Sequence, residues 1–142
     1  MPDQTPAATI ESLETRLYKT RQALRELRKS QAQAVEDYTF ATLQGPVQLS
    51  GLFGGGSDAG GSDLLVVHNM GKHCHYCTLW ADGLNGLSKP LLDRCPVVVS
   101  SPDDPQTQAD FAASRGWPLP MVSCGENSFA ADMGYHVPEK KS

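Results

Sequence analysis

A pair of cysteines that follows a short apolar run constrains this chain more than any other feature. Residues 64–67 read Leu-Leu-Val-Val, a continuous apolar stretch typical of a strand buried on both faces. A turn containing Gly71 then leads to Cys74 and Cys77. Beyond the pair, four apolar residues recur at helical spacing: Trp80, Leu84, Leu87 and Leu91. The pattern predicts a strand, a turn, and a helix that begins at the cysteines.

The spacing of the cysteines indicates redox chemistry. Two intervening residues bring both sulfurs onto one helical turn, close enough to form a disulfide. The free N–H groups of that turn and the helix dipole favour a thiolate at the first position. We therefore expect Cys74 to be the nucleophile and Cys77 to resolve the mixed disulfide. The isolated Cys95 and Cys124 are expected to be small buried residues.

Composition excludes several classes of function. The chain has 142 residues and a net charge of −4, so no basic surface predicts binding to nucleic acid or to an anionic membrane. No apolar stretch is long enough to span a membrane, and the N-terminus lacks the pattern of a secretory signal. Four cysteines are too few for a disulfide scaffold. We expect a cytoplasmic protein whose cysteines are present for their reactivity.

The N-terminal segment has the pattern of a long amphipathic helix. Within residues 8–34, apolar residues follow alternating steps of three and four, a heptad-like stripe made of Ile10, Leu13, Leu17, Leu24 and Leu27. Such a helix could pack on its own domain or act as a dimerising arm, and both alternatives stay open. We divide the chain into an arm of residues 1–34 and a domain of residues 35–142.

The remaining segments alternate between strand and helix patterns, which predicts an α/β fold with a parallel sheet. The expected elements are a hairpin with one helical turn (37–53), a flexible connector (54–62), a strand (96–101), a helix from Asp104 to Gly116, a strand (117–123) and a short helix (127–133). Tyr76 and Trp80 are expected to be packing residues, although Tyr76 could instead shape the rim of a peptide-binding face. Asp82 is expected to interact with the helix dipole.

Several of these segments together resemble a known family. The similarity is to the bacterial thioredoxin-like family catalogued as predicted dithiol-disulfide oxidoreductases, relatives of the peroxiredoxins and thiol peroxidases. It covers about residues 35–135 and rests on residues 37–40, 45–49, 52–53, 64–67, 74–86, 98–100 and 116–123. The resemblance implies a thioredoxin-like (peroxiredoxin-like) sheet flanked by helices, cysteine chemistry and no cofactor. The closing hairpin of such chains has no counterpart after residue 134, so we expect a C-terminally shortened version of the fold.

Three of the four histidines lie close to the cysteine pair. An imidazolium at His75, between the cysteines, would stabilise the thiolate and make the disulfide more oxidising. His68 lies where thioredoxins carry a buried acid. By that analogy it could be a general base for Cys77, or it could be a core histidine bonded to backbone. A zinc or copper site of His73, Cys74, His75 and Cys77 is a further alternative, although adjacent residues on one turn rarely converge on an ion.

The sequence thus predicts a thiol-disulfide oxidoreductase that acts on protein or small-molecule disulfides without a bound cofactor. One alternative is a thiol-dependent peroxidase, although Val67 and Gly71 replace the Pro and Thr/Ser that precede the reactive cysteine in peroxiredoxins. Another is a non-enzymatic metal-binding or dimeric scaffold protein. Without the closing hairpin, the strand at 64–67 would have one open edge, and with the heptad-like stripe this predicts a homodimer.

Overall fold

The computed structural model describes residues 6–54 and 63–136. The chain divides into two compact units, Met1–Glu36 and Asp37–Ser142, which are described separately. Most of the predicted connector at 54–62 lies outside the described residues. No helix in the described ranges combines the length and the apolar character that crossing a membrane requires.

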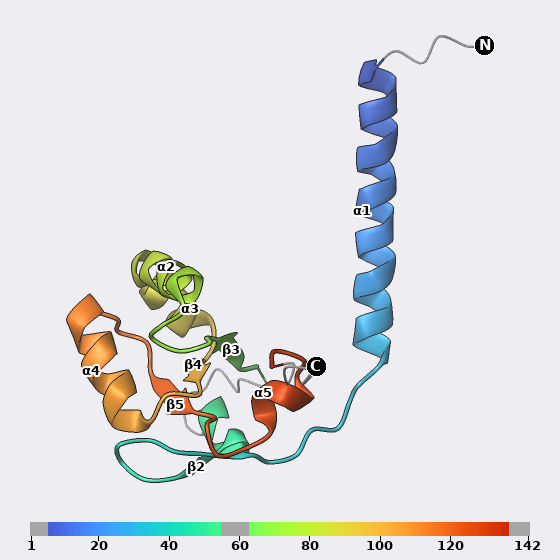
Figure 1. The fold of residues 1–142 in the computed structure, drawn as a ribbon. Helices are drawn as coiled ribbons and strands as arrows, with labels where there is room; N and C mark the ends of the chain where they lie inside the picture. Colours follow the sequence, from blue (N-terminus) through green and yellow to red (C-terminus); the bar gives the residue numbers. More distant parts are fainter. Residues whose placement is uncertain (1–5, 55–62, 137–142) are drawn as a thin grey trace, which may run out of the picture. The chain divides into compact units, whose positions relative to one another are not determined.

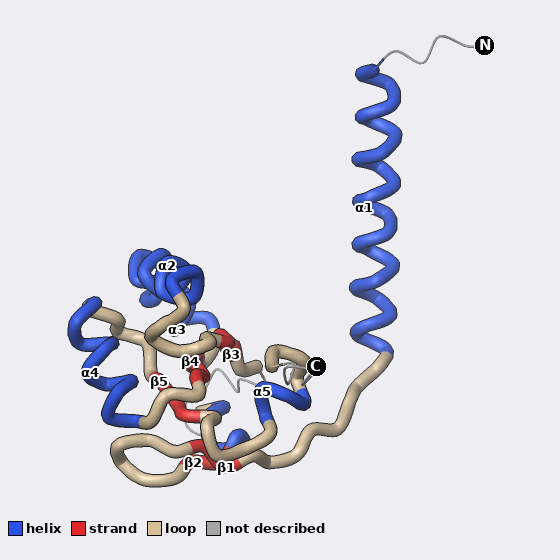
Figure 2. Tube along the Cα trace, in the orientation of Figure 1, coloured by secondary structure: helices blue, strands red, loops and turns tan. Residues whose placement is uncertain are grey.

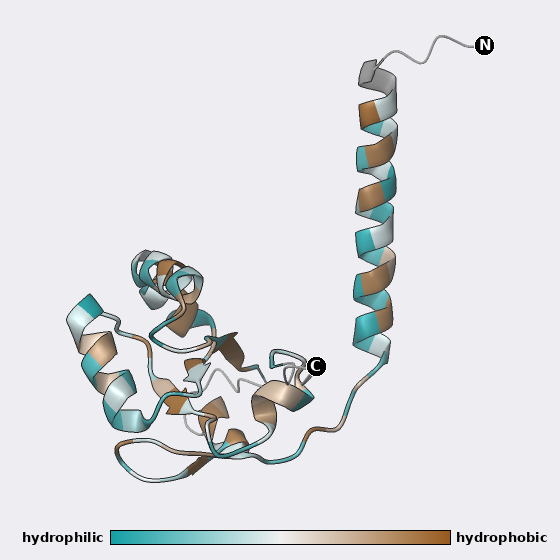
Figure 3. Ribbon diagram, in the orientation of Figure 1, coloured by the Kyte–Doolittle hydropathy of each residue, from teal (hydrophilic) through white to brown (hydrophobic). Residues whose placement is uncertain are grey.

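The first unit is built on one helix, α1 (Pro6–Ser30). This helix ends four residues before the predicted end at residue 34. The hydroxyl of Ser30 donates a hydrogen bond to the carbonyl of Leu27, 2.8 Å away, and a serine that bonds a helix carbonyl in this way competes with the backbone ladder. Figure 3 shows apolar residues recurring along the helix. The five residues of the stripe are all exposed, from 44% for Leu24 to 59% for Leu27.

The second unit is organised around a three-stranded parallel sheet in the order β3-β4-β5 (Figure 1). The predicted mixed α/β class is therefore confirmed. The strands are β3 (Leu65–His68), β4 (Val97–Ser101) and β5 (Met121–Ser123). The first crossover contains α2 (His75–Leu84), a 3-10 turn η2 (Asn85–Leu87) and α3 (Ser88–Arg94), and the second contains α4 (Pro105–Arg115).

A short hairpin precedes the sheet, as predicted. Its strands, β1 (Thr39–Phe40) and β2 (Val47–Gln48), are antiparallel and lead into one 3-10 turn, η1 (Leu49–Phe53) (Figure 2). An antiparallel bridge between Ala41 and Ser123 joins the hairpin to β5.

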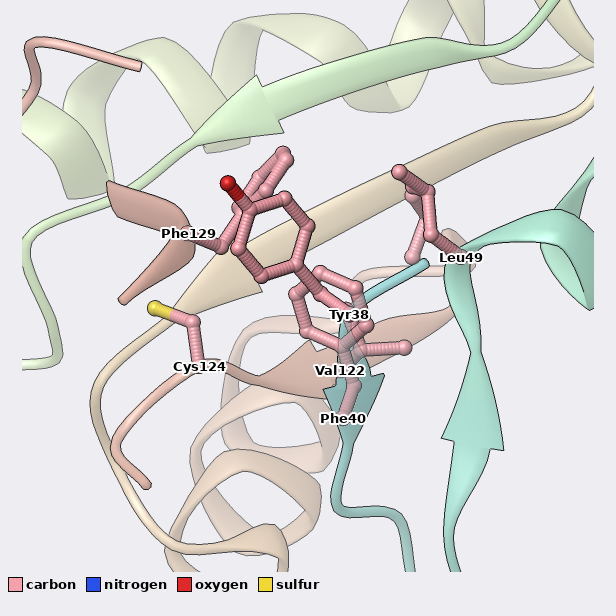
Figure 4. Close-up of a cluster of buried hydrophobic side chains, with 7 residues drawn as sticks. Tyr38, Phe40, Leu49, Val122, Cys124 and Phe129 are labelled. Carbon is pink, nitrogen blue, oxygen red and sulfur yellow. The ribbon is translucent and has the colours of Figure 1, made fainter. Parts of the chain in front are cut away.

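Two apolar clusters hold the sheet, one on each face. On one face the hairpin and α5 (Phe129–Asp132) bury Tyr38, Phe40, Leu49, Val98, Val122, Cys124 and Phe129 (Figure 4). On the other face Val97 and Val99 pack with Leu119, and with Leu84 of α2 and Leu91 of α3. Cys124 is buried, as expected, whereas Cys95 is half-buried.

The strand β3 is less buried than predicted. Val66 and Val67 pack into the clusters on opposite faces but are only partly buried, and Leu65 is 40% exposed. Among the described residues β3 pairs only with β4, so it has the open edge that the sequence predicted. The amides of Leu65 and Asn69 bond to β4, which directs the backbone groups of Val66 and His68 toward the open edge. Four consecutive apolar residues indicate that both faces of a strand are apolar, but they do not indicate which strands pair with its two edges.

The predicted single helix after the cysteines is interrupted at η2. Of the four apolar residues at helical spacing, only Leu84 and Leu91 pack on the sheet, whereas Trp80 is 74% exposed and Leu87 is also exposed. The buried residues of α2 are Thr78 and Ala81. Because the helix changes pitch at residues 85–87, a spacing counted across that turn does not define one face.

The helix ends predicted from capping residues are confirmed. The Asp104 carboxylate accepts a hydrogen bond from the Thr107 amide at 3.0 Å, Pro105 is the first residue of α4, and Gly116 ends it with φ of 67°. The predicted helix at 127–133 is shorter, limited to α5, and is followed by Gly134 with φ of 79°.

Candidate functional site

The turn between β3 and α2 positions the cysteine pair. The Asn69 side chain accepts a hydrogen bond from the Gly71 amide at 2.8 Å, and the Asp103 carboxylate accepts one from the Lys72 amide at 2.7 Å. Gly71 has φ of 111°, and a Cβ there would lie 3.1 Å from both Asp103 Oδ1 and His73 Cε1. The turn therefore requires glycine at this position.

Each sulfur of the pair accepts a hydrogen bond from a backbone amide. Cys74 is the N-cap residue of α2, and its Sγ accepts from the amide of Cys77 at 3.3 Å, as the side-chain oxygen of a capping serine would. Cys77 Sγ accepts from the amide of Met70 in the preceding turn, also at 3.3 Å. The cysteine pair therefore begins a helix, as the sequence predicts, and both thiols are half-buried.

The two thiols differ in acidity. The side chain of Cys77, and then its amide, donate hydrogen bonds that lower the pKa of Cys74 below the ordinary thiol value. Burial raises the pKa of Cys77, and the hydrogen bond with Cys74 raises it further to a smaller extent. One sulfur of the pair is therefore suited to be a thiolate and the other to stay protonated.

The side chains of His73 and His75 are both exposed. Neither side chain forms a hydrogen bond with a cysteine sulfur in the part of the chain that the structure describes. The Cys77 thiol and amide are the main causes of the lowered pKa of Cys74. The electrostatic role of His75 stays a prediction.

His68 lies apart from the cysteine pair. Its ring stacks on Tyr135 at 3.7 Å between centroids and on Phe129 at 5.3 Å. Alternation along β3 places His68 on the same face as Val66, whereas α2, which carries Cys77, covers the opposite face. Burial lowers the pKa of His68, which favours the neutral ring. The structure shows no contact that supports a general-base role toward Cys77, and the predicted role is untested.

An ion pair fixes the far end of α2. Asp82 accepts hydrogen bonds from the Arg115 guanidinium and from Trp117 Nε1, the latter at 2.8 Å. These bonds lower the pKa of Asp82 to about 2, and those from Arg115 have the largest effect. The expectation that Asp82 interacts with the N-terminal dipole is wrong, because it lies in the last turn of α2. Its partners are 33 and 35 residues away along the chain, and no local pattern indicates them.

An exposed apolar surface lies beside the cysteine pair. It consists of Met70, Tyr76, Leu79 and Trp80, and Tyr76 is 80% exposed. The expectation that Tyr76 and Trp80 are packing residues is therefore wrong. Tyr76, Leu79 and Trp80 follow i, i+3, i+4 spacing on the solvent side of α2, opposite the buried Ala81. For this surface, named here the α2 patch, the sequence analysis indicated only that Tyr76 could lie at the rim of a peptide-binding face.

The arrangement of the His, Cys, Asp and Glu side chains bears on the alternative of a metal site. Within residues 6–54 and 63–136, no three His, Cys, Asp or Glu side chains are arranged as a set that could hold an ion. His73, Cys74, His75 and Cys77 are neighbours along the chain but do not form such a set.

Fold and site define a small α/β protein with two inequivalent thiols at the start of a helix. The chain belongs to a family of bacterial proteins of unknown function (DUF899), whose family model matches residues 8–142. The matched region includes α1 from its third residue as well as the whole second unit. No curated protein matches the chain.

This family assignment corrects the resemblance inferred from the sequence. The matched family is one of unknown function, and nothing in the comparisons points to a thioredoxin-like or peroxiredoxin family. The segments on which the resemblance rested are short, and a Cys-x-x-Cys pair at a helix start occurs on more than one fold. A motif of that length describes local chemistry rather than ancestry.

Proposed function

We propose that this protein is a thiol-disulfide oxidoreductase whose reactive groups are Cys74 and Cys77. The observation that carries the proposal is the placement of the pair at the start of α2, where the Sγ of Cys74 accepts a hydrogen bond from the amide of Cys77 at 3.3 Å. A nucleophile must be ionised to attack, whereas a resolving thiol must stay protonated until the mixed disulfide has formed. The hydrogen bonds from Cys77 lower the pKa of Cys74 and burial raises the pKa of Cys77, and these two directions favour the two roles.

In the first step, the Cys74 thiolate attacks one sulfur of a substrate disulfide. A new S–S bond joins Cys74 to the substrate, the substrate's own S–S bond breaks, and the leaving sulfur departs as a thiolate that takes a proton from water. Before attack, the thiol of Cys77 and its amide stabilise the negative charge on Cys74.

In the second step, Cys77 loses its proton and attacks the Sγ of Cys74. The mixed disulfide breaks, the second substrate thiol leaves, and a Cys74–Cys77 disulfide forms. The substrate gains two electrons and the protein loses two, so a dithiol reductant is needed to complete a cycle. The same steps in reverse would oxidise a substrate dithiol.

The α2 patch supports a polypeptide as the substrate rather than a small disulfide. Large apolar side chains that gather on a surface, here Tyr76, Leu79 and Trp80, commonly mark sites of interaction with other chains. Because Tyr76 lies between the two cysteines, a polypeptide held on the patch would bring its disulfide close to Cys74.

Two finer points belong to the same proposal. A thioredoxin-like arrangement of the second unit is supported by the parallel sheet and by a cysteine pair at the start of the helix after β3. A cytoplasmic location is supported by the cysteine content, since four cysteines in 142 residues are too few for the disulfide scaffold of a small secreted protein. Nuclear Overhauser contacts between the strands of the full chain test the first point, and imaging of a tagged protein tests the second.

The test compares Cys74→Ser, Cys77→Ser and, as a control, Cys95→Ser in the reduction of insulin disulfides by a dithiol. We expect Cys74→Ser to be inactive, Cys77→Ser to accumulate a mixed disulfide with the substrate, and Cys95→Ser to behave as wild type. Equal activity of wild type and Cys74→Ser would show that the proposal is wrong. Activity toward peroxide but not toward insulin would favour the peroxidase alternative.

A further inference from the structure

The stripe on α1 is a regular surface that the proposed chemistry does not use. Its residues follow steps of three and four along the part of α1 from residue 10 to residue 27, which contains no glycine or proline, with Thr20 at the one position where a large apolar residue is missing. All five of its apolar side chains are exposed, Ile10, Leu13, Leu17, Leu24 and Leu27. This is the a/d pattern of a helix that buries one face against another helix.

We propose that α1 pairs with α1 of a second copy of this chain, in antiparallel orientation. From Ile10 to Leu27 the steps between neighbouring stripe positions are three, four, three, four and three residues, an order that is the same in both directions. The stripe of one helix therefore faces the stripe of a second, reversed helix position by position. Ile10 lies opposite Leu27 of the second copy, Leu13 opposite Leu24, and Leu17 opposite Thr20. Each of these layers occurs twice, on the two sides of a twofold axis near residues 18 and 19.

The charges beside the stripe decide the orientation. With Ile10 and Leu13 at a and d, Glu14 and Arg21 occupy e positions and Arg16 occupies a g position. A parallel pair brings Arg16 of one copy beside Arg21 of the other, twice, which is repulsive. The antiparallel pair brings Glu14 beside Arg21 of the other copy, twice, which is attractive.

The overall charge distribution along α1 also favours the antiparallel orientation. The first half of the helix carries Glu11 and Glu14 with one cation, Arg16, whereas the second half carries one acid, Glu26, and five cations, Lys19, Arg21, Arg25, Arg28 and Lys29. Reversing one helix places the acidic turns of each copy beside the basic turns of the other. It also opposes the two helix dipoles, since each N-terminus lies beside a C-terminus.

The first test measures the oligomeric state of the full chain by sedimentation equilibrium for wild type, Thr20→Leu and Thr15→Leu. Thr20 lies in the stripe and Thr15 on the opposite face of the same helix, so the two substitutions are chemically identical. We expect a dimer whose dissociation constant falls about tenfold with Thr20→Leu, or about 1.4 kcal/mol, and is unchanged by Thr15→Leu. A monomer in all three proteins, or an equal response to both substitutions, would overturn the proposal.

The second test measures orientation with charge reversals in the full chain. In the antiparallel pair, Arg21→Glu faces Glu14 and should raise the dissociation constant about tenfold, whereas adding Glu14→Arg should restore it. In a parallel pair, Arg21→Glu would face Arg16 and strengthen the dimer. A strengthened dimer in the single variant, or no rescue in the double variant, would overturn the antiparallel orientation.

Discussion

The amide of Cys77 donates a hydrogen bond to the Sγ of Cys74 across 3.3 Å. This contact exists because Cys74 is the N-cap of α2, where a side-chain acceptor normally satisfies a free amide of the first turn. One interaction therefore caps the helix and stabilises a thiolate. A serine at position 74 would preserve the cap while removing the nucleophile, which makes Cys74→Ser a suitable inactive variant.

The first prediction concerns the source of the acidity of Cys74. Cys77→Ala removes the side-chain donor, whereas Cys77→Ser replaces it with a hydroxyl donor. Because the thiol of Cys77 is the largest cause of the lowered pKa, we expect the pKa of Cys74 to be lowest in wild type and highest in Cys77→Ala. The rate of Cys74 alkylation against pH, followed by mass spectrometry of the peptide, measures it. A Cys77→Ala curve identical to wild type would contradict this account.

The second prediction concerns His75, which lies in the first turn of α2. Replacing it by alanine removes a group that can carry positive charge next to the thiolate. We expect a higher pKa for Cys74 and a more reducing pair, by tens of millivolts, where ~30 mV corresponds to ~1.4 kcal/mol. His136→Ala is the control, since His136 is exposed and lies outside the cysteine turn. Superimposable titrations of the wild type and His75→Ala would assign no electronic role to His75.

The third prediction concerns stability at low pH. Asp82 has a pKa of about 2 in the folded protein against an ordinary value of 3.8, so the unfolded chain binds the proton more readily. The stabilisation by Asp82 is therefore complete well above pH 3.8 and is lost as the pH falls toward 2. We expect Asp82→Asn to lower the Tm by a few degrees at neutral pH and by progressively less as the pH falls.

The exposed Asp93 provides the control for that experiment, since the Asp93→Asn change has the same chemistry without the Arg115 and Trp117 contacts. Thermal unfolding followed by circular dichroism measures both variants across pH. The account fails if the two variants lower the Tm equally at neutral pH.

The fourth prediction compares two Gly→Ala substitutions of opposite sign. A Cβ on Gly125 would lie 2.6 Å from the carbonyl oxygen of Pro102, whereas nothing lies within 4 Å of a Cβ on Gly83 in α2. We expect Gly125→Ala to destabilise the protein and Gly83→Ala to stabilise it by up to ~1 kcal/mol, because alanine favours a helix. Urea unfolding measures both free energies. Equal effects of the two substitutions would show that the close approach at Gly125 is relieved at no cost.

Features with local signals could be predicted from the sequence. The start and end of α4 follow from Asp104, Pro105 and Gly116, and the helix start at the cysteines follows from their spacing after an apolar run. These signals act over a few residues, and the structure preserves them.

Contacts between distant segments could not be predicted. Asp103 holds the turn before Cys74 through the amide of Lys72, 31 residues away, and nothing near Asp103 in the sequence indicates this partner. The α2 patch was missed for a different reason. Helical spacing places Trp80 one turn before Leu84 on α2, but it does not indicate how much of that side the sheet covers: Leu84 packs on the sheet and Trp80 is 74% exposed.

The most direct test of the central claim is the equilibrium of the reduced full-length protein with glutathione buffers of increasing oxidising strength. The fraction oxidised and the bonded residues are determined by mass spectrometry. The account predicts one two-electron transition that forms the Cys74–Cys77 disulfide, with Cys95 and Cys124 still reduced. A chain in which Cys74 and Cys77 stay unpaired under oxidising conditions, or form only separate glutathione adducts, would contradict it.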